Sequence, residues 1–205
     1  TEMSSYGQKI NNEPLNATNF TDLFIASDDT QYFIVPVVNG EEQWDKVGAV
    51  QLWDNNYMDI PIQKPENNKV NGEEYSYTPG DASVGDLDGD GEYELVVKWD
   101  CAPRDNSQAG LTGNVYLDAY KLNGKKLWRI DLGKNIRAGA HYTQFLVYDF
   151  DMDGKAEVAC KTAPGSIDGV GKYVSETSSV DEIRNANDNT VSYVNQNGYI
   201  LDGNE

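Results

Sequence analysis

Two segments of the chain repeat the same ladder of acidic residues. Residues 86–94 read DLDGDGEYE and residues 149–157 read DFDMDGKAE, so both follow the pattern D-x-D-x-D-G-x-x-E. Carboxylates at the first, third and fifth positions of a loop, a glycine for the tight turn and a distal acid form an oxygen cage that suits a hard cation such as Ca²⁺. One such ladder could be a solvated acidic turn, but two with identical spacing favour calcium-binding loops.

The predicted calcium ligands include the acids of both ladders and the residue at the seventh position of each loop. They are Asp86, Asp88, Asp90, Glu92 and Glu94 in the first loop and Asp149, Asp151, Asp153, Lys155 and Glu157 in the second. An EF-hand would place its bidentate glutamate at the twelfth position and continue into a helix. Here the last acid comes at the ninth position and a strand-like run follows. A dockerin-like pair would also need helices and a much closer spacing.

Composition narrows the class of partner. The 205 residues include 16 basic and 34 acidic side chains, which give a formal net charge of −18. Such a surface argues against a nucleic-acid partner, because nucleic-acid-binding proteins carry basic patches. No apolar run approaches the roughly 20 residues that a membrane helix needs, so we expect no membrane partner. Calcium is abundant outside cells, and the two loops therefore favour a secreted, extracellular protein.

The pattern around each ladder predicts antiparallel strands. Each ladder lies between two short apolar, β-branched runs, which is a hairpin signal, and Asn123-Gly124 between alternating runs is another. A four-stranded unit that repeats at tens of residues is typical of a β-propeller blade. No segment reads as a convincing amphipathic helix. The predicted strands are 81–86, 93–99, 113–122 and 126–132 in one blade, and 141–149 and 156–162 in the next.

The sequence thus predicts an all-β chain with three parts. Residues 1–60 look like the C-terminal half of a fibronectin type III-like β-module. Residues 61–78, rich in Pro, Asn and Glu, are predicted to be a linker, and residues 79–205 to form the first blade and part of the next propeller blade. Propellers usually close with 4–8 blades. We therefore expect the chain to be a fragment whose partner is the remainder of the propeller, as a missing or separate chain segment.

The two cysteines do not force a disulfide. Cys160 lies within an apolar strand pattern, whereas Cys101 is predicted to begin a loop. A bridge between them is open, but two separate thiols are favoured.

Residues 77–163 resemble a known family. The segments 77–91 (YTPGDASVGDLDGDG), 118–122 (DAYKL) and 127–145 (LWRIDLGKNIRAGAHYTQF) resemble the first blade of the rhamnogalacturonan lyases of polysaccharide lyase family eleven. Integrin-like and adhesin propellers share the acidic ladder, but the run at 133–145 is more specific. The resemblance extends weakly back to about residue 20 and fades after residue 172.

The resemblance implies a fold and an activity. Members of that family have an eight-bladed, calcium-rich propeller preceded by a small β-module. They cleave the rhamnose–galacturonate backbone of a pectic polysaccharide, rhamnogalacturonan I, by β-elimination. The resemblance also implies Ca²⁺ as the cofactor. The competing hypothesis is a non-catalytic, calcium-stabilised propeller for carbohydrate binding or adhesion.

Propeller topology then separates structural from substrate-facing residues. The loops after the second and fourth strands of a blade open on one face, and the ladder turns lie on the opposite face. We expect Lys134, Arg137 and His141 on the catalytic face, and Asp105, Asn106 and Arg137 in contact with sugar. A structural alternative exists for two of them: Arg137 could brace the next strand, and His141 could be a packed histidine. The catalytic base is unassigned and could lie on blades outside this chain.

Overall fold

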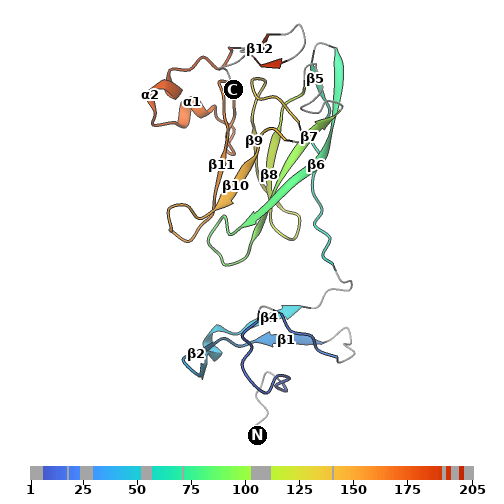
Figure 1. Cartoon of the computed structure of the whole chain (residues 1–205), viewed down its shortest axis with the longest axis vertical. Coiled ribbons are helices and arrows are strands. Elements are labelled where there is room, and N and C mark those ends of the chain that lie inside the picture. The colour runs from blue at the N-terminus through green and yellow to red at the C-terminus, as the bar shows by residue number, and fades with distance from the viewer. Residues whose placement is uncertain are drawn as a thin grey trace. The chain divides into compact units, whose positions relative to one another are not determined.

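A computed structural model shows that the chain divides into two compact units, Thr1–Asp59 and Ile60–Glu205 (Figure 1). Strands dominate both units, and the only α-helices in the described part of the chain have four residues each, so the predicted all-β class is confirmed. No helix among the described residues is long and apolar enough to cross a membrane. The described residues are 7–17, 19–23, 30–51, 57–70, 72–102, 112–139, 141–190, 193–194 and 199–200.

The first unit contains two small antiparallel sheets. Strand β1 (Gln31–Ile34) pairs with β4 (Gly48–Gln51), and β2 (Val37–Val38) pairs with β3 (Glu41–Glu42). The turn between β2 and β3 uses two residues with positive φ, Asn39 at 54° and Gly40 at 85°, as tight hairpins of this kind require. A 3₁₀ turn, η1 (Trp44–Lys46), precedes β4. Whether this unit is the predicted fibronectin type III-like half-module stays a prediction.

The second unit is built on one antiparallel meander. Its five strands are hydrogen-bonded in sequence order: β5 (Asn68–Val70), β6 (Glu73–Gly85), β7 (Glu94–Ala102), β8 (Tyr116–Tyr120) and β9 (Lys126–Asp131). The four strands expected here are confirmed, with shifted ends. The predicted turn at Asn123-Gly124 is also present, because Gly124 has a φ of 82° and its N–H donates to the carbonyl of Lys121 at 2.8 Å.

The linker predicted over residues 61–78 is wrong in its second half. Strand β5 lies inside it, and β6 begins at Glu73, with a break in register between Pro79 and Ala82. Tyr75 and Tyr77 alternate along β6 and are completely buried in the core. The polar residues around the two tyrosines hid a period-2 pattern that is characteristic of a strand.

Cys101 does not begin a loop, as the sequence suggested, but lies buried inside β7, where its backbone pairs with Tyr77. Cys101 and Cys160 are both free thiols, so the favoured interpretation of the two cysteines is confirmed.

A further hairpin packs beside the meander. Strand β10 (Phe145–Tyr148) pairs with β11 (Glu157–Cys160), at the two positions where strands were expected. Gly85 permits the hairpin to come close: a Cβ there would lie 2.7 Å from the Cβ of Ala156 and 2.8 Å from Cγ1 of Val147. The N–H of Ala156 also donates to the carbonyl of Asp86 at 2.6 Å. The two acidic turns are therefore neighbours.

The chain after β11 is polar and mostly irregular. It contains two helices that the sequence did not predict, α1 (Val174–Thr177) and α2 (Asp181–Arg184), and the short strands β12 (Tyr193–Val194) and β13 (Tyr199–Ile200). Each helix has only one turn, and a single turn is too short to show an amphipathic period.

A buried carboxylate organises the middle of the meander. Asp118 is fully buried, and its Oδ2 accepts hydrogen bonds from Nε1 of Trp99 at 2.8 Å and from the hydroxyl of Tyr120 at 2.7 Å. The Arg129 guanidinium donates to both oxygens of Asp118, at 2.6 Å each. The Tyr120 hydroxyl also bonds the backbone of Gln63, so this network ties the segment before β5 to the sheet.

We predict that Asp118→Ala lowers the free energy of unfolding by about 3 kcal/mol or more, because it leaves a cation and two further donors without their buried acceptor. Urea denaturation followed by tryptophan fluorescence measures the loss. Asp181→Ala is the matched control, since its ion pair with Arg184 is on the surface and should contribute about 0–1 kcal/mol. Equal losses in the two variants would contradict the role of the Asp118 network.

Candidate metal centre

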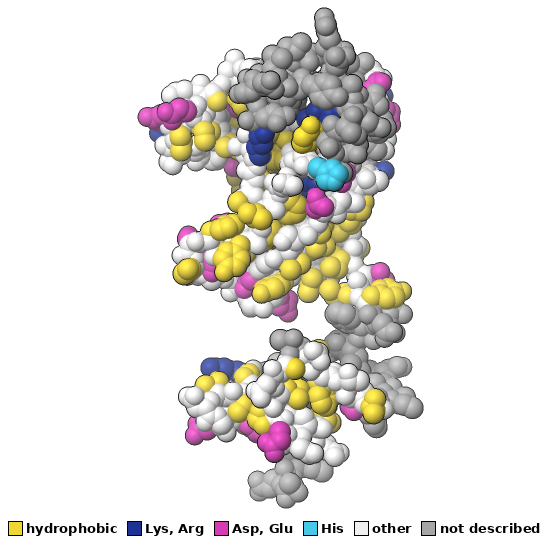
Figure 2. Space-filling model, viewed as in Figure 1, with side chains coloured by type: hydrophobic (Ala, Val, Ile, Leu, Met, Phe, Trp, Pro, Cys, Tyr) yellow, Lys and Arg dark blue, Asp and Glu magenta, His cyan; other side chains and the backbone are white. Residues whose placement is uncertain are grey.

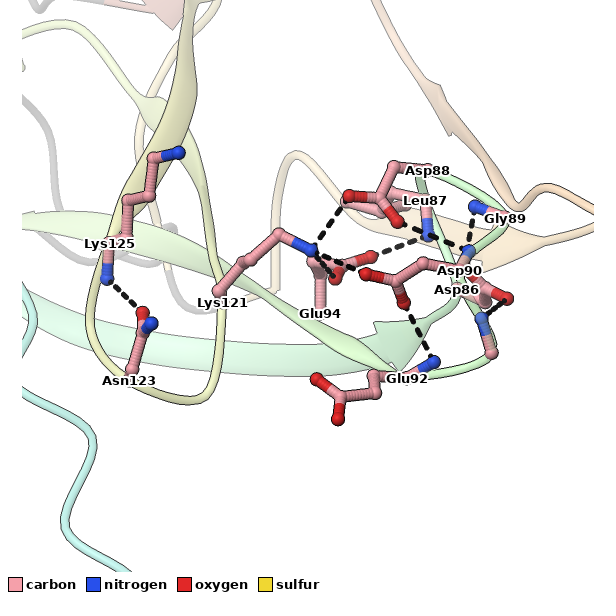
Figure 3. Close-up of polar contacts among 11 residues, drawn as sticks. Asp86, Leu87, Asp88, Gly89, Asp90, Glu92, Glu94, Lys121, Asn123 and Lys125 are labelled. Carbon is pink, nitrogen blue, oxygen red and sulfur yellow. Dashed lines mark hydrogen bonds and ion pairs between the residues drawn. The ribbon is translucent and has the colours of Figure 1, made fainter. Parts of the chain in front are cut away.

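The turn between β6 and β7 holds the first acidic ladder, and its own backbone shapes it (Figure 3). Oδ1 of Asp86 accepts the N–H of Gly89 at 2.6 Å and of Asp90 at 3.1 Å, and Oδ2 accepts the N–H of Gly91 at 2.9 Å. Gly89 and Gly91 have φ values of 79° and 90°, a region that favours glycine. Asp86 thus folds the loop around its own carboxylate.

The other three ladder carboxylates each give one oxygen to a backbone donor. Oδ1 of Asp88 accepts the N–H of Asp90 at 3.3 Å, and Oδ1 of Asp90 accepts the N–H of Glu92 at 2.9 Å. Oε2 of Glu94 accepts the N–H of Leu87 at 2.7 Å. One oxygen on each side chain is therefore left for another partner.

The ammonium group of Lys121, at the start of the β8–β9 turn, forms ion pairs with those three oxygens. Its Nζ lies 2.7 Å from Oδ2 of Asp88, 2.8 Å from Oδ2 of Asp90 and 3.3 Å from Oε1 of Glu94 (Figure 3). The hydrogen bonds that Lys121 donates to these carboxylates, that to Asp88 first, raise the pKa of Lys121. The same contact, with the N–H of Glu92, holds the pKa of Asp90 below its usual value. The sequence reasoning missed this lysine because it lies 27 residues beyond the ladder.

The second ladder, between β10 and β11, repeats the backbone pattern. Met152 and Gly154 take up positive φ values of 64° and 91°, at the positions equivalent to Gly89 and Gly91. The same oxygens accept backbone N–H groups: Asp149 Oδ1 from Asp153 at 3.1 Å, Asp149 Oδ2 from Gly154 at 3.0 Å, Asp151 Oδ1 from Asp153 at 3.2 Å, Asp153 Oδ1 from Lys155 at 2.8 Å and Glu157 Oε2 from Phe150 at 2.9 Å.

Both ladders have the size of a calcium cage. Calcium–oxygen distances are about 2.3–2.6 Å, so two ligands on opposite sides of one ion lie roughly 5 Å apart. Ligand oxygens of Asp149, Asp151, Asp153 and Glu157 all lie within 4.8 Å of one another, as do those of Asp86, Asp88 and Glu94. The donor sets therefore fit Ca²⁺. Neither group includes the side chain of Glu92 or Lys155, which contribute backbone N–H groups to the turns instead.

The residues predicted for a catalytic face lie beyond the other end of the sheet. Figure 1 shows the ladder turns at one end of the meander and the segment after β9 at the opposite end. Lys134 is exposed, and its Nζ donates to the carbonyl of Asn189 at 3.3 Å. His141 is also exposed (cyan in Figure 2). Asp105 and Asn106 lie outside the described residues.

Arg137 is buried, with only 7% of its surface exposed. Its guanidinium lies 5.8 Å from the ring centre of Tyr142, and Nη1 donates to the carbonyl of Ala138 at 3.3 Å. These contacts are what the bracing role would require, and substrate contact by Arg137 stays a prediction.

The polar stretch after β11 is fixed to the segment after β9. The buried side-chain amide of Asn135 donates to the carbonyls of Pro164 and Thr190, at 2.7 Å each. The hydroxyl of Ser166 donates to the carbonyl of Leu132 at 2.7 Å. Sequence reasoning missed Asn135, since a single Asn in a polar loop carries no periodic signal. The stretch that follows β11 is thus part of the surface where substrate contact was expected.

Comparisons with known proteins agree with the resemblance. The chain is 51% identical over 201 residues to the rhamnogalacturonan endolyase YesW of Bacillus subtilis (strain 168), a match that covers 97% of this chain and 30% of YesW. It is 46% identical over 202 residues to the rhamnogalacturonan exolyase YesX of the same organism, covering 97% of this chain and 31% of YesX. The chain thus spans about a third of the length of these relatives.

The fold agrees with the sequence matches. The crystal structure of YesW superposes with a TM-score of 0.77 at 50% identity, over 96% of this chain and 32% of that one. The family described as rhamnogalacturonan lyase family 11, C-terminal domain, matches residues 57–205. The chain therefore belongs to rhamnogalacturonan lyase family 11.

Proposed function

We propose that the protein to which this chain contributes is a rhamnogalacturonan lyase that cleaves the rhamnose–galacturonate backbone of pectin by β-elimination. The observation that carries the proposal is the 51% identity to a rhamnogalacturonan endolyase over 97% of the chain. Identity at this level, spread over both units, favours a shared activity over a binding or adhesion protein that shares only the acidic ladders.

We also propose that the second unit is the start of a calcium-rich propeller. Four antiparallel strands in sequence order, β6 to β9, followed by a hairpin beside β6, match the pattern of one blade and the next. Leu146 and Tyr148 on β10 are 64% and 66% exposed, and Figure 2 shows apolar side chains gathered on the visible face of this unit. Further blades of the complete protein would cover such a face.

The reaction sets requirements on the site. β-Elimination removes the weakly acidic proton at C5 of galacturonate, so the enzyme must neutralise the adjacent carboxylate, accept the proton and protonate the departing O4. When bound, Ca²⁺ supplies charge neutralisation, and in the two ladders the groups it neutralises are the chain's own carboxylates. The exposed Lys134 and His141 lie at the opposite end of the sheet, where they attract an acidic polymer. Arg137 positions the segment that carries them.

The activity predicts an unsaturated product. With rhamnogalacturonan I as substrate, the complete protein should give a rise in ultraviolet absorbance in calcium-containing buffer, and chelator should slow the rise by tenfold or more. A homogalacturonan substrate is the control and should give little signal. Tight binding of rhamnogalacturonan without any rise in absorbance would favour the non-catalytic alternative, a secreted carbohydrate-binding propeller.

Calcium should stabilise the chain. An ion that binds only the folded state at a hundred times its dissociation constant adds about 2.7 kcal/mol to the free energy of unfolding. Added Ca²⁺ should therefore raise the melting temperature of this chain, and chelator should lower it. Asp153→Asn should reduce the response, whereas Asp181→Asn, on helix α2, should leave it intact. A melting temperature that changes with neither calcium nor chelator would refute the metal proposal.

A further inference from the structure

Lys121 is held at a fixed place beside the first ladder. Its backbone N–H donates to the carbonyl of Lys125 at 2.9 Å, and its carbonyl accepts the N–H of Gly124 at 2.8 Å, so the Asn-Gly turn sets its position. The Lys121 side chain is 23% exposed, and Glu94, one of its partners, is 1% exposed. A buried carboxylate is stable as an anion only when a cation or several donors face it.

The ammonium group matches the cage in number and direction. An ammonium has three N–H donors, and three carboxylate oxygens face it, one each from Asp88, Asp90 and Glu94. These are the oxygens that the backbone of the loop leaves free, and two of the three side chains, Asp88 and Glu94, belong to the group whose oxygens converge in the first ladder. Figure 3 shows Lys121 reaching these side chains from outside the loop, whereas Lys125 in the same turn does not.

The second ladder has nearly the same backbone bonds, but no lysine pairs with its carboxylates among the described residues. Oδ2 of Asp151, Oδ2 of Asp153 and Oε1 of Glu157 are the equivalent oxygens, and no ion pair to them occurs within the described part of the chain. All four carboxylates of this ladder converge within 4.8 Å, whereas Asp90 is absent from the convergent group of the first ladder. Asp90 instead directs Oδ2 at Lys121, 2.8 Å away.

We propose that the two ladders are unequal cation sites, because Lys121 is a built-in counter-ion that competes with Ca²⁺ in the first ladder. The second ladder then binds Ca²⁺ more tightly and depends on it, while the first keeps its shape without the ion. This inference rests on the proposed calcium binding, and it adds a residue outside the ladders that tunes the affinity of one of them.

The test isolates each ladder in this chain. Asp151→Asn with Asp153→Asn disables the second ladder, and Asp88→Asn with Asp90→Asn disables the first. Isothermal titration with Ca²⁺ then gives one affinity for each. Lys121→Met is introduced where only the first ladder remains, with Lys125→Met as the matched control, because Lys125 is an exposed lysine of the same turn that forms no ion pair in the described structure. Lys121→Arg keeps the charge.

The first ladder should bind Ca²⁺ at least about tenfold more weakly than the second. Lys121→Met should strengthen it by about fivefold or more, since a unit charge about 4 Å from the ion is removed, while Lys125→Met and Lys121→Arg should stay close to the parent. In chelator, with both ladders otherwise intact, Lys121→Met should melt at a lower temperature than Lys125→Met, because three carboxylates have then lost the cation that pairs with them.

Two failures can be told apart. Equal affinities for the two ladders, unchanged by Lys121→Met, would overturn the competition while leaving calcium binding in place. If neither isolated ladder binds Ca²⁺, the calcium proposal fails, and the melting difference in chelator still decides whether Lys121 is a counter-ion. Equal melting of the two lysine variants would reject that role as well.

Discussion

Like charges gathered in tight turns are the constraint on which the second unit depends. The second ladder brings four carboxylates toward one point and the first brings three, and these like charges repel one another more strongly the closer they lie. Backbone N–H groups offset part of this repulsion, and the glycines and the other residues with positive φ aim those groups inward. In the first ladder Lys121 offsets more of the repulsion, and we propose that bound Ca²⁺ balances the rest. The strands on either side, β6 with β7 and β10 with β11, hold the turns closed.

The meander resolves a second electrostatic problem in its centre by a different route. Asp118 accepts four hydrogen bonds, from an indole, a phenol and a guanidinium, so both of its oxygens have partners within the protein. Lys98, fully buried on β7, similarly pairs with Asp81 at 2.6 Å. The interior of the sheet thus relies on donors and cations of the protein itself, whereas the turns at its end carry the carboxylates for which we propose an external cation. This division explains how so acidic a chain forms a compact unit.

Local patterns made much of the fold predictable. The ladders, the Asn-Gly turn and the apolar runs between them predicted strands β6 to β11 because turn chemistry and period-2 alternation act over a few residues. The strand that contains Tyr75 and Tyr77 was not predicted, because the residues around them are polar and include prolines. The linker predicted there was therefore wrong. The fibronectin-like half-module and the closed propeller stay predictions, because both depend on packing between segments that are distant in sequence.

The candidate sites divide in the same way. The ladder acids could be identified from spacing alone, because loop ligands are close in sequence. Lys121 and Asn135 could not, because each acts on residues 27 or more positions away, and one lysine or one asparagine has no pattern of its own. The role of Arg137 was left open by the sequence for a related reason: burial at 7% exposure is a property of the folded chain.

Gly85 determines how closely the β10–β11 hairpin can pack against β6. A methyl group at this position would overlap both Ala156 and Val147. The hairpin can therefore pack this closely only because Gly85 has no side chain. Any bulkier residue would wedge the second acidic turn away from the first and break the bond from Ala156 to Asp86. Sequence drift in this neighbourhood is therefore restricted by sterics at a position that bears no functional group at all.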